Sequence, residues 1–307
     1  EGKRTPDNLM SASSHQPRPS VFSRVFSPEP RENTQPLAPT GRAGRNLPAA
    51  VSSAVVLIAL LVASLLVVQG IFVAFVCCIA LLGLWELGGA FARVGTRLAM
   101  APLYLGAIGM MVCAWFLGPE AVTMALYLTV FAVVAWRLVD APTPSRITDI
   151  IASVFSAVYV PFLACFVVLL LRDFRSPAVI GVYVLVTCFN DIGGWLAGIM
   201  FGKHPMAPRL SPKKSWEGFI GSLFFCILTG VGGFMLLGAT WWWGVIAGIC
   251  GCVCATIGDL TESLIKREVG LKDMSALIPG HGGVLDRVDS LVMTAPVFYV
   301  IFIFALR

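Results

Sequence analysis

Charged side chains are scarce in this sequence. Asp, Glu, Lys and Arg make up 13% of its 307 residues, about half of the share that is usual in soluble proteins. So few charges cannot cover the water-facing surface of a chain of this length. The shortage excludes an intrinsically disordered protein, a nucleic-acid-coating protein and an ordinary cytosolic enzyme, and the net charge of +5 is too modest to indicate a nucleic-acid partner.

The sequence also shows no pattern that indicates a zinc site or a disulfide framework. The three histidines are too scattered along the chain to complete a zinc site. The nine cysteines all lie in apolar segments. We therefore expect them to be small packing residues of the core, in preference to metal or redox centres.

Apolar residues, by contrast, make up 57% of the sequence. They form nine runs of membrane-spanning length, which is roughly 20 residues for a hydrocarbon core of about 30 Å. The predicted spans are 49–68, 71–92, 98–117, 121–139, 148–171, 178–201, 217–237, 241–260 and 290–306. These runs are continuous and do not alternate between polar and apolar residues, so sheets and a β-barrel are set aside. The sequence predicts an all-α polytopic integral membrane protein with about nine transmembrane helices.

The distribution of Lys and Arg predicts the topology. With the N-terminus inside, nineteen of the 22 basic residues fall in inside segments, and only Arg172, Arg175 and Arg307 fall outside. Basic residues concentrate in cytoplasmic loops of membrane proteins. The N-terminus is therefore expected in the cytoplasm and, after nine spans, the C-terminus outside.

Three regions follow along the chain. Residues 1–48 hold eight of the nineteen prolines and show no apolar periodicity, so they are expected to form a disordered cytoplasmic tail and not a secretory signal. Residues 49–175 form an N-terminal membrane region of five helices, in which Glu86 and Arg137 are expected to snorkel toward the interface. Residues 176–307 form a catalytic membrane region of four helices with two basic cytoplasmic loops.

Acidic residues cluster around the last of these loops. Asp259, Glu262 and Lys266 are spaced i, i+3, i+7 and share one helical face, with Ser263 beside them. A second acidic pair, three residues apart, follows at the start of the last span. Converging carboxylates at a membrane boundary are costly unless paired or bound to a cation, and oxygen ligands suit Mg²⁺, Ca²⁺ or Mn²⁺. From spacing alone, a metal site and a salt-bridged loop are equally favoured.

A glycine-rich turn at 279–283 lies between the two acidic groups and favours phosphate chemistry. Glycines let the backbone approach a phosphate and direct N–H groups at it. Nearby Lys and Arg would neutralise charge during phosphoryl or nucleotidyl transfer. His281 is expected to have a binding or structural role more readily than that of a general base.

The same residues resemble a known family signature. The series is Ser263-x-x-Lys266-Arg267-x₄-Lys272-Asp273-x₅-Pro279-Gly280-His281-Gly282-Gly283-x-x-Asp286-Arg287-x-Asp289. It is similar to the signature of phosphatidate cytidylyltransferases, also called CDP-diacylglycerol synthases, and its thirteen fixed positions make it specific. The segment 211–218 and the stretch from Asp191 to Lys203 also resemble the family. Met274-Ser275 stands where relatives often have Phe-Gly.

The resemblance implies transfer of the cytidylyl group of CTP to phosphatidate, giving CDP-diacylglycerol and pyrophosphate. It implies a divalent metal, Mg²⁺ with Mn²⁺ as the alternative, and a monovalent cation, K⁺. The metal ligands it indicates are Asp259, Asp286 and Asp289. The catalytic set it indicates is Lys266, Arg267, Lys272, His281, Asp286 and Arg287. It also implies a homodimer in the cell inner (cytoplasmic) membrane, in contact with membrane lipids.

The substrate-binding residues predicted with it are Asp191, Lys203, Ser211, Lys213, Lys214, Ser263, Gly280, Gly282 and Gly283. Two assignments have alternatives. Lys213 and Lys214 either hold the triphosphate or lipid headgroup or anchor the loop to anionic lipid. Asp191 either lines a polar cavity or makes a helix–helix contact.

Two other functions compete with nucleotidyl transfer. A CTP-dependent lipid-alcohol kinase would need similar carboxylates and metal. An ion-coupled transporter would use Asp191 and broken helices as an ion pathway, but the two halves show no matching interrupted segments.

Overall fold

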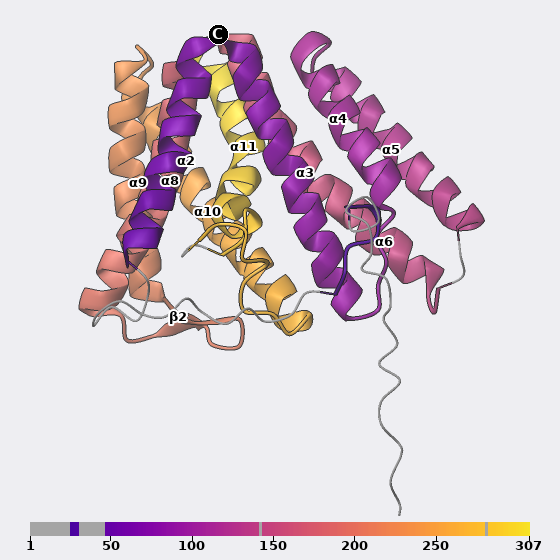
Figure 1. Ribbon diagram of the computed structural model, residues 1–307. Coiled ribbons are helices and arrows are strands. Elements are labelled where there is room, and N and C mark those ends of the chain that lie inside the picture. The colour runs from indigo at the N-terminus through magenta and orange to yellow at the C-terminus, as the bar shows by residue number, and fades with distance from the viewer. Residues whose placement is uncertain (1–24, 31–46, 141–142, 280–281) are drawn as a thin grey trace, which may run out of the picture.

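The computed structural model describes residues 25–30, 47–140, 143–279 and 282–307, and most of them are helical (Figure 1). The elements in chain order are α2 (Leu47–Val67), α3 (Gln69–Arg93), α4 (Met100–Phe116), α5 (Pro119–Val139), α6 (Arg146–Ala157), η1 (Val158–Phe162), α7 (Leu163–Phe174), α8 (Pro177–Phe201), β1 (Pro205–Ala207), β2 (Ser211–Ser215), α9 (Trp216–Leu236), α10 (Trp241–Glu268) and α11 (Leu285–Leu306). In lipid a helix satisfies its own backbone groups, which is why continuous apolar runs fold this way.

Seven helices in the described part of the chain are long and apolar enough to cross a membrane. They are α3, α5, the α6–η1–α7 unit, α8, α9, α10 and α11. Two further apolar helices are shorter, namely Val55–Val67 within α2 and Met100–Phe116. The prediction of an all-α polytopic integral membrane protein is confirmed at this level.

Two helices that carry acidic residues extend beyond their predicted limits. α10 continues to Glu268, although the apolar run ends near residue 260, and α11 begins at Leu285, five residues before the predicted start. The predicted spans stop short of these helix ends because they follow hydrophobicity alone, although the spacing of Asp259, Glu262 and Lys266 indicates a helical face up to residue 266. The polar turns have good helix formers, and Lys266 and Arg267 lie in the last turn of α10, where cations favour the helix dipole.

The predicted span 148–171 is interrupted in the middle. Pro161 lies inside the helix, and the five residues Val158–Phe162 form a single π-helical turn between α6 and α7. Proline lacks the N–H of a normal helical bond and its ring clashes with the preceding turn, so the wider turn is a local accommodation.

A short antiparallel hairpin joins α8 to α9. Its strands pair Pro205 with Ser215 and Ala207 with Ser211, with an irregular register between them. Setting all sheets aside was therefore wrong for this loop. The side chain of Glu217 accepts hydrogen bonds from the backbone N–H groups of Lys203 and His204 and lies 2.6 Å from His204 Nδ1, so the start of α9 holds the base of the hairpin.

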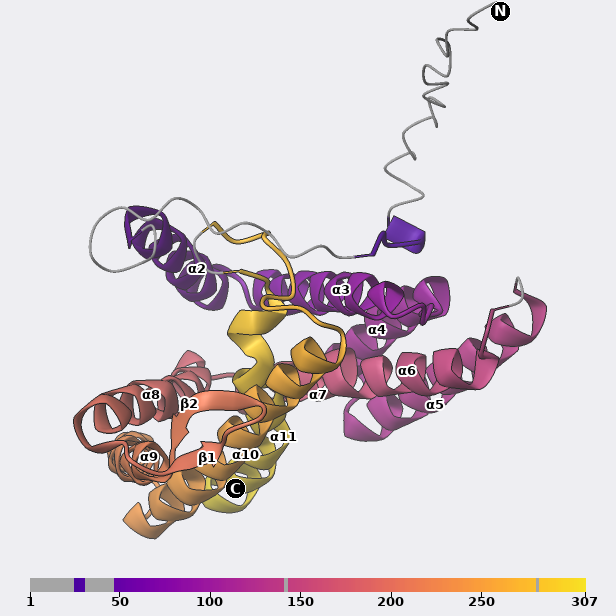
Figure 2. The ribbon, with the colours of Figure 1, turned by 90° about the horizontal axis from the view of Figure 1, so that it is seen from below.

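The helices form two groups that meet at α11. α8, α9, α10 and α11 pack successively on one another, while α4 packs on α5, and α11 also contacts α3 and α7. Figure 1 shows the hairpin at one end of the bundle and the C-terminus at the other. Figure 2, from the hairpin side, shows β1 and β2 in front of α8, α9 and α10.

Residues 25–30 and Arg137 make contacts that the sequence does not indicate. Residues 25–30, part of the predicted disordered tail, contact the bundle, since the rings of Phe26 and Tyr104 lie 6.0 Å apart. The rest of the predicted tail, apart from the first two residues of α2, lies outside the described residues. Arg137 does not snorkel, because its side chain is 3% exposed and donates to Asp140 at 2.7 Å and to the Arg97 carbonyl at 2.6 Å.

Glycines set the close approach of α9 to α10. A Cβ built at Gly248 would lie 2.5 Å from Ile227 Cα and 2.6 Å from Ile227 N, both backbone atoms. Small residues allow such backbone contact between membrane helices. The backbone cannot move aside as a flexible side chain would.

We therefore expect Gly248→Ala to lower the free energy of unfolding by about 1–3 kcal/mol, the usual cost of overpacking. The matched control is Gly232→Ala, also in a helix, where a Cβ would meet nothing within 4 Å and alanine is expected to stabilise by up to about 1 kcal/mol. Thermal unfolding of both variants in detergent measures the difference. Equal midpoints for the two would mean that the helices do not meet at Gly248.

Candidate active site

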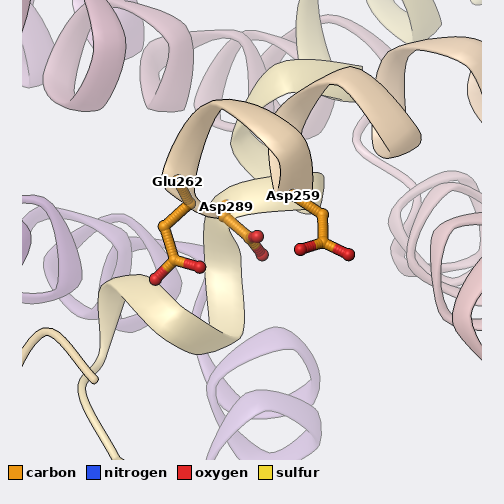
Figure 3. A group of neighbouring side chains, drawn as sticks. All are labelled: Asp259, Glu262 and Asp289. Carbon is orange, nitrogen blue, oxygen red and sulfur yellow. The ribbon is translucent and has the colours of Figure 1, made fainter. Parts of the chain in front are cut away.

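Three carboxylates converge between α10 and α11. Asp259 and Glu262 lie one turn apart on α10, and Asp289 lies on α11; one carboxylate oxygen from each falls within 4.8 Å of the others. Figure 3 shows Asp289 between the two α10 residues. Helix spacing brings Asp259 and Glu262 to one face, but only the packing of α11 adds the third group.

The cluster has an uncompensated polar atom. Glu262 is 2% exposed, and its Oε1 atom has no hydrogen-bond partner among the described residues. Asp289 is 8% exposed, and no ion pair to it occurs within the described ranges. Buried carboxylate oxygens without partners are costly, so the arrangement suits a cation held by oxygen ligands.

Lys266 and Asp286 lie beside this cluster. Lys266 Nζ is 2.6 Å from Glu262 Oε2 and 2.8 Å from Asp286 Oδ1. Both carboxylate side chains are 3% exposed. Lys266 thus engages both Asp286, which was predicted as a metal ligand, and Glu262, which with Asp259 and Asp289 forms the cluster. Lys266, predicted to contact phosphate, neutralises two buried acids.

The glycine-rich turn is held by the protein's own carboxylates. Asp286 Oδ2 accepts the N–H groups of Gly283 at 2.7 Å and Met274 at 3.0 Å. Ile278 and Gly282 exchange backbone hydrogen bonds, with Gly282 at a φ of 89°, a conformation that favours glycine. Gly280 and His281 lie outside the described residues. The N–H of Gly283, expected to point at a phosphate, is directed at Asp286.

Glu86 is a residue whose role sequence reasoning missed. It was expected to snorkel, but it is 0% exposed and accepts hydrogen bonds from Ser275, Val284 and Leu285. A carboxylate in an apolar helix is itself a functional signal. The position of Glu86 near the end of α3 hides this signal, because carboxylates at helix ends commonly reach the interface.

A cavity of about 260 Å³ opens beside the acidic cluster. Its polar lining is Asn190, Asp191, Lys213, Lys214, Ser215, Ser222, Thr256 and Asp259. Lys214 forms an ion pair with Asp259, which connects the hairpin, the cavity and the carboxylates. Asp191 therefore lines a polar cavity, and Asn190, Ser222 and Thr256 are wall residues that the sequence did not indicate.

Of the other predicted site residues, Ser263 and Arg267 on α10 make contacts to Asp259 and to the hairpin. Ser263 Oγ lies 3.5 Å from Asp259 Oδ1, and Arg267 Nε donates to the Leu210 carbonyl at 3.3 Å, joining α10 to the hairpin. Ser211 begins β2. Lys203, Lys272 and Arg287 are exposed.

A family model described as the cytidylyltransferase family matches residues 48–305. The chain belongs to the cytidylyltransferase family. The match covers α3 to α10 entirely and nearly all of α2 and α11, so the family's pattern extends across the helical part of the chain.

Curated relatives agree. A protein of Mycobacterium bovis named phosphatidate cytidylyltransferase is 34% identical over 281 residues, which is 87% of this chain and 92% of the relative. One of Mycobacterium leprae with the same name is 34% identical over 280 residues, covering 84% and 88%. One of Haemophilus influenzae, also so named, is 38% identical over 163 residues, covering 48% and 55%. The family suggested by the 263–289 series is confirmed.

Proposed function

We propose that this chain is a phosphatidate cytidylyltransferase that makes CDP-diacylglycerol and pyrophosphate from CTP and phosphatidate. The observation that carries the proposal is Asp259, which belongs both to the carboxylate cluster and to the wall of a cavity lined by Lys213 and Lys214. Anionic phosphates and a cation can meet there. The names of the relatives support the same substrates.

The reaction needs no protein nucleophile. An oxygen of the phosphatidate phosphate forms a bond to the α-phosphorus of CTP, and the bond from that phosphorus to the oxygen bridging to the β-phosphate breaks. The electron pair leaves with pyrophosphate. Since both reactants are anions, the protein's work is to position them and to offset their charge.

The carboxylate cluster fits a divalent cation, Mg²⁺ or alternatively Mn²⁺, because all its donors are oxygens and Glu262 Oε1 is buried without a partner in the described chain. Asp259, Glu262 and Asp289 would hold it. When bound, the cation supplies charge neutralisation for the phosphates. We also propose that a monovalent cation, K⁺, binds near the divalent one. Asp286 would then not bind the divalent cation itself. It would hold Lys266 and the backbone N–H groups of Gly283 and Met274 in place.

The two lysines of the hairpin are proposed to bind phosphate. Lys213 is exposed at the cavity and Lys214 reaches Asp259. Ammonium groups bind phosphate as point charges with short, strong hydrogen bonds. Lys214 would exchange its carboxylate partner for a phosphate oxygen as CTP or the lipid headgroup enters, while the acyl chains of phosphatidate stay in the bilayer.

We further propose nine transmembrane helices, with the hairpin end of the bundle in the cytoplasm of a cell-membrane protein and the C-terminus outside. The bias of nineteen inside basic residues against three supports this orientation. It puts the cavity on the side where CTP is found. We also propose that the membrane part divides into regions 49–175 and 176–307, and that the protein is a homodimer.

Two labels of CTP test the reaction. We expect purified protein with phosphatidate and Mg²⁺ to transfer the α-phosphate label into lipid and to release the γ-label as pyrophosphate. EDTA should abolish the transfer, since the carboxylates then lack their cation. A γ-label found in lipid would mean a kinase, and flux of ions in liposomes without any nucleotide reaction would mean a transporter.

A further inference from the structure

Glu86 connects the N-terminal half of the chain to the loop before α11. Its Oε1 atom accepts from Ser275 Oγ at 2.5 Å and from Val284 N at 2.8 Å, and Oε2 accepts from Leu285 N at 2.8 Å. The residue comes from α3, nearly 200 positions earlier, and is completely buried. Both carboxylate oxygens are therefore committed to one short segment.

That segment is the start of the helix that bears the acidic residues. α11 begins at Leu285, and the residue before it, Val284, has no side chain that can cap a helix. The first N–H groups of a helix need acceptors and favour negative charge. Glu86 supplies both from another helix, and Asp286 and Asp289 follow within the next turn.

Glu86 and Asp286 enclose the loop closely at Gly283. A Cβ built there would lie 2.8 Å from Glu86 Oε1 and 2.9 Å from Asp286 Oδ2. Glu86 holds Val284 and Leu285, while Asp286 holds Gly283 and Met274. A displacement of Glu86 would therefore move the residue that engages Lys266.

We propose that Glu86 is a positioning residue for nucleotidyl transfer, which fixes the first turn of α11 and so the placement of Asp286 and Asp289 at the site. The inference rests on the proposed function. Glu86 is not among the residues that line the cavity or form the carboxylate cluster, and its hydrogen bonds go to Ser275, Val284 and Leu285, so it acts through the loop. Supporting residues behind a metal or reaction site typically change activity by about 10- to 100-fold.

The test compares Glu86→Gln with Asp149→Asn. Glutamine has the same shape but only one acceptor oxygen, so at least one backbone N–H loses its partner. Asp149 is a matched control because it is 2% exposed, accepts the N–H of Arg97 at 2.8 Å and lies on α6. Steady-state kinetics, Mn²⁺ binding followed by electron paramagnetic resonance, and thermal unfolding are measured on both in detergent.

We expect Glu86→Gln to lower kcat by about 10-fold or more, to weaken Mn²⁺ binding similarly, and to leave the KM for CTP nearly unchanged because the cavity lysines are intact. Ser275→Ala, which removes one of the three bonds, should have a smaller effect. Asp149→Asn should keep kcat and Mn²⁺ binding at the wild-type level.

Two results would overturn the inference. One is wild-type kcat and Mn²⁺ affinity in Glu86→Gln. The other is a loss of activity that merely follows the loss of folded protein, equal in Glu86→Gln and Asp149→Asn. If wild-type protein makes no CDP-diacylglycerol, the proposed function fails instead, and Mn²⁺ binding still decides whether Glu86 places the acidic residues.

Discussion

Replacement of Asp289 by Asn is expected to lower kcat by about 100-fold or more. Asp289 is the one residue that α11 adds to the pair on α10, and it is buried without an ion pair in the described chain. The amide keeps the shape but removes one of three negative ligands. A loss of about 3 kcal/mol of charge stabilisation corresponds to this factor. Initial rates of α-labelled CDP-diacylglycerol formation measure it, and added Mg²⁺ should restore part of the rate.

Asp173→Asn is the matched control for this acid-to-amide change. Asp173 is 11% exposed and is held by Tyr299 and by the C-terminal Arg307, at the end of the bundle away from the hairpin. We expect its kcat to stay at the wild-type level. Similar rates in Asp289→Asn and Asp173→Asn would mean that the acidic cluster is structural and that the cation binds elsewhere.

Replacement of Lys266 by Met is expected to cause the largest loss of stability. Lys266 is the shared ion-pair partner of Glu262 and Asp286, whose side chains are each 3% exposed. Removing one partner of a buried ion pair typically lowers the free energy of unfolding by about 3–5 kcal/mol, because the remaining charge stays buried. Thermal unfolding should be followed in EDTA, so that no divalent cation replaces the lysine charge.

The control for Lys266→Met is Arg172→Met. Arg172 is 29% exposed and lies 3.4 Å from Asp173, and a pair of this kind contributes about 1 kcal/mol or less. A Tm for Lys266→Met as high as that for Arg172→Met would contradict the prediction, since it would show that the two acids do not need this charge.

Hydrophobicity predicts the helices better than their ends. The apolar runs indicate α8 and α9 to within a few residues. They miss the last two turns of α10 because residues 261–268 are mostly polar yet helical. Glu262 and Lys266 on α10, with Asp286 and Asp289 on α11, lie beyond the predicted spans, so the boundary errors fall on the residues that matter most for function.

Neither the hairpin nor the contacts of Glu86 can be predicted from hydrophobicity or from local spacing. Five strand residues, Ser211–Ser215, contain two lysines and a proline, which resembles a loop and not a strand. Glu86 meets a segment nearly 200 positions later in the chain. Contacts of this separation depend on how α3 packs against α11, and no local spacing encodes them.

The sequence by itself determined the predominantly helical membrane fold and the family, and it predicts the chemical type of the site. Those conclusions depend on local quantities, namely the free energy of apolar side chains in lipid and a series of charged and glycine residues at fixed spacing. Only the tertiary structure decided which acids converge, because Asp286 and Asp289 lie three residues apart on the same helix and their spacing does not tell them apart. The packing of α11 on α10 directs Asp289 toward Asp259 and Glu262, while Asp286 forms an ion pair with Lys266. This difference in orientation depends on contacts between helices that are distant in sequence.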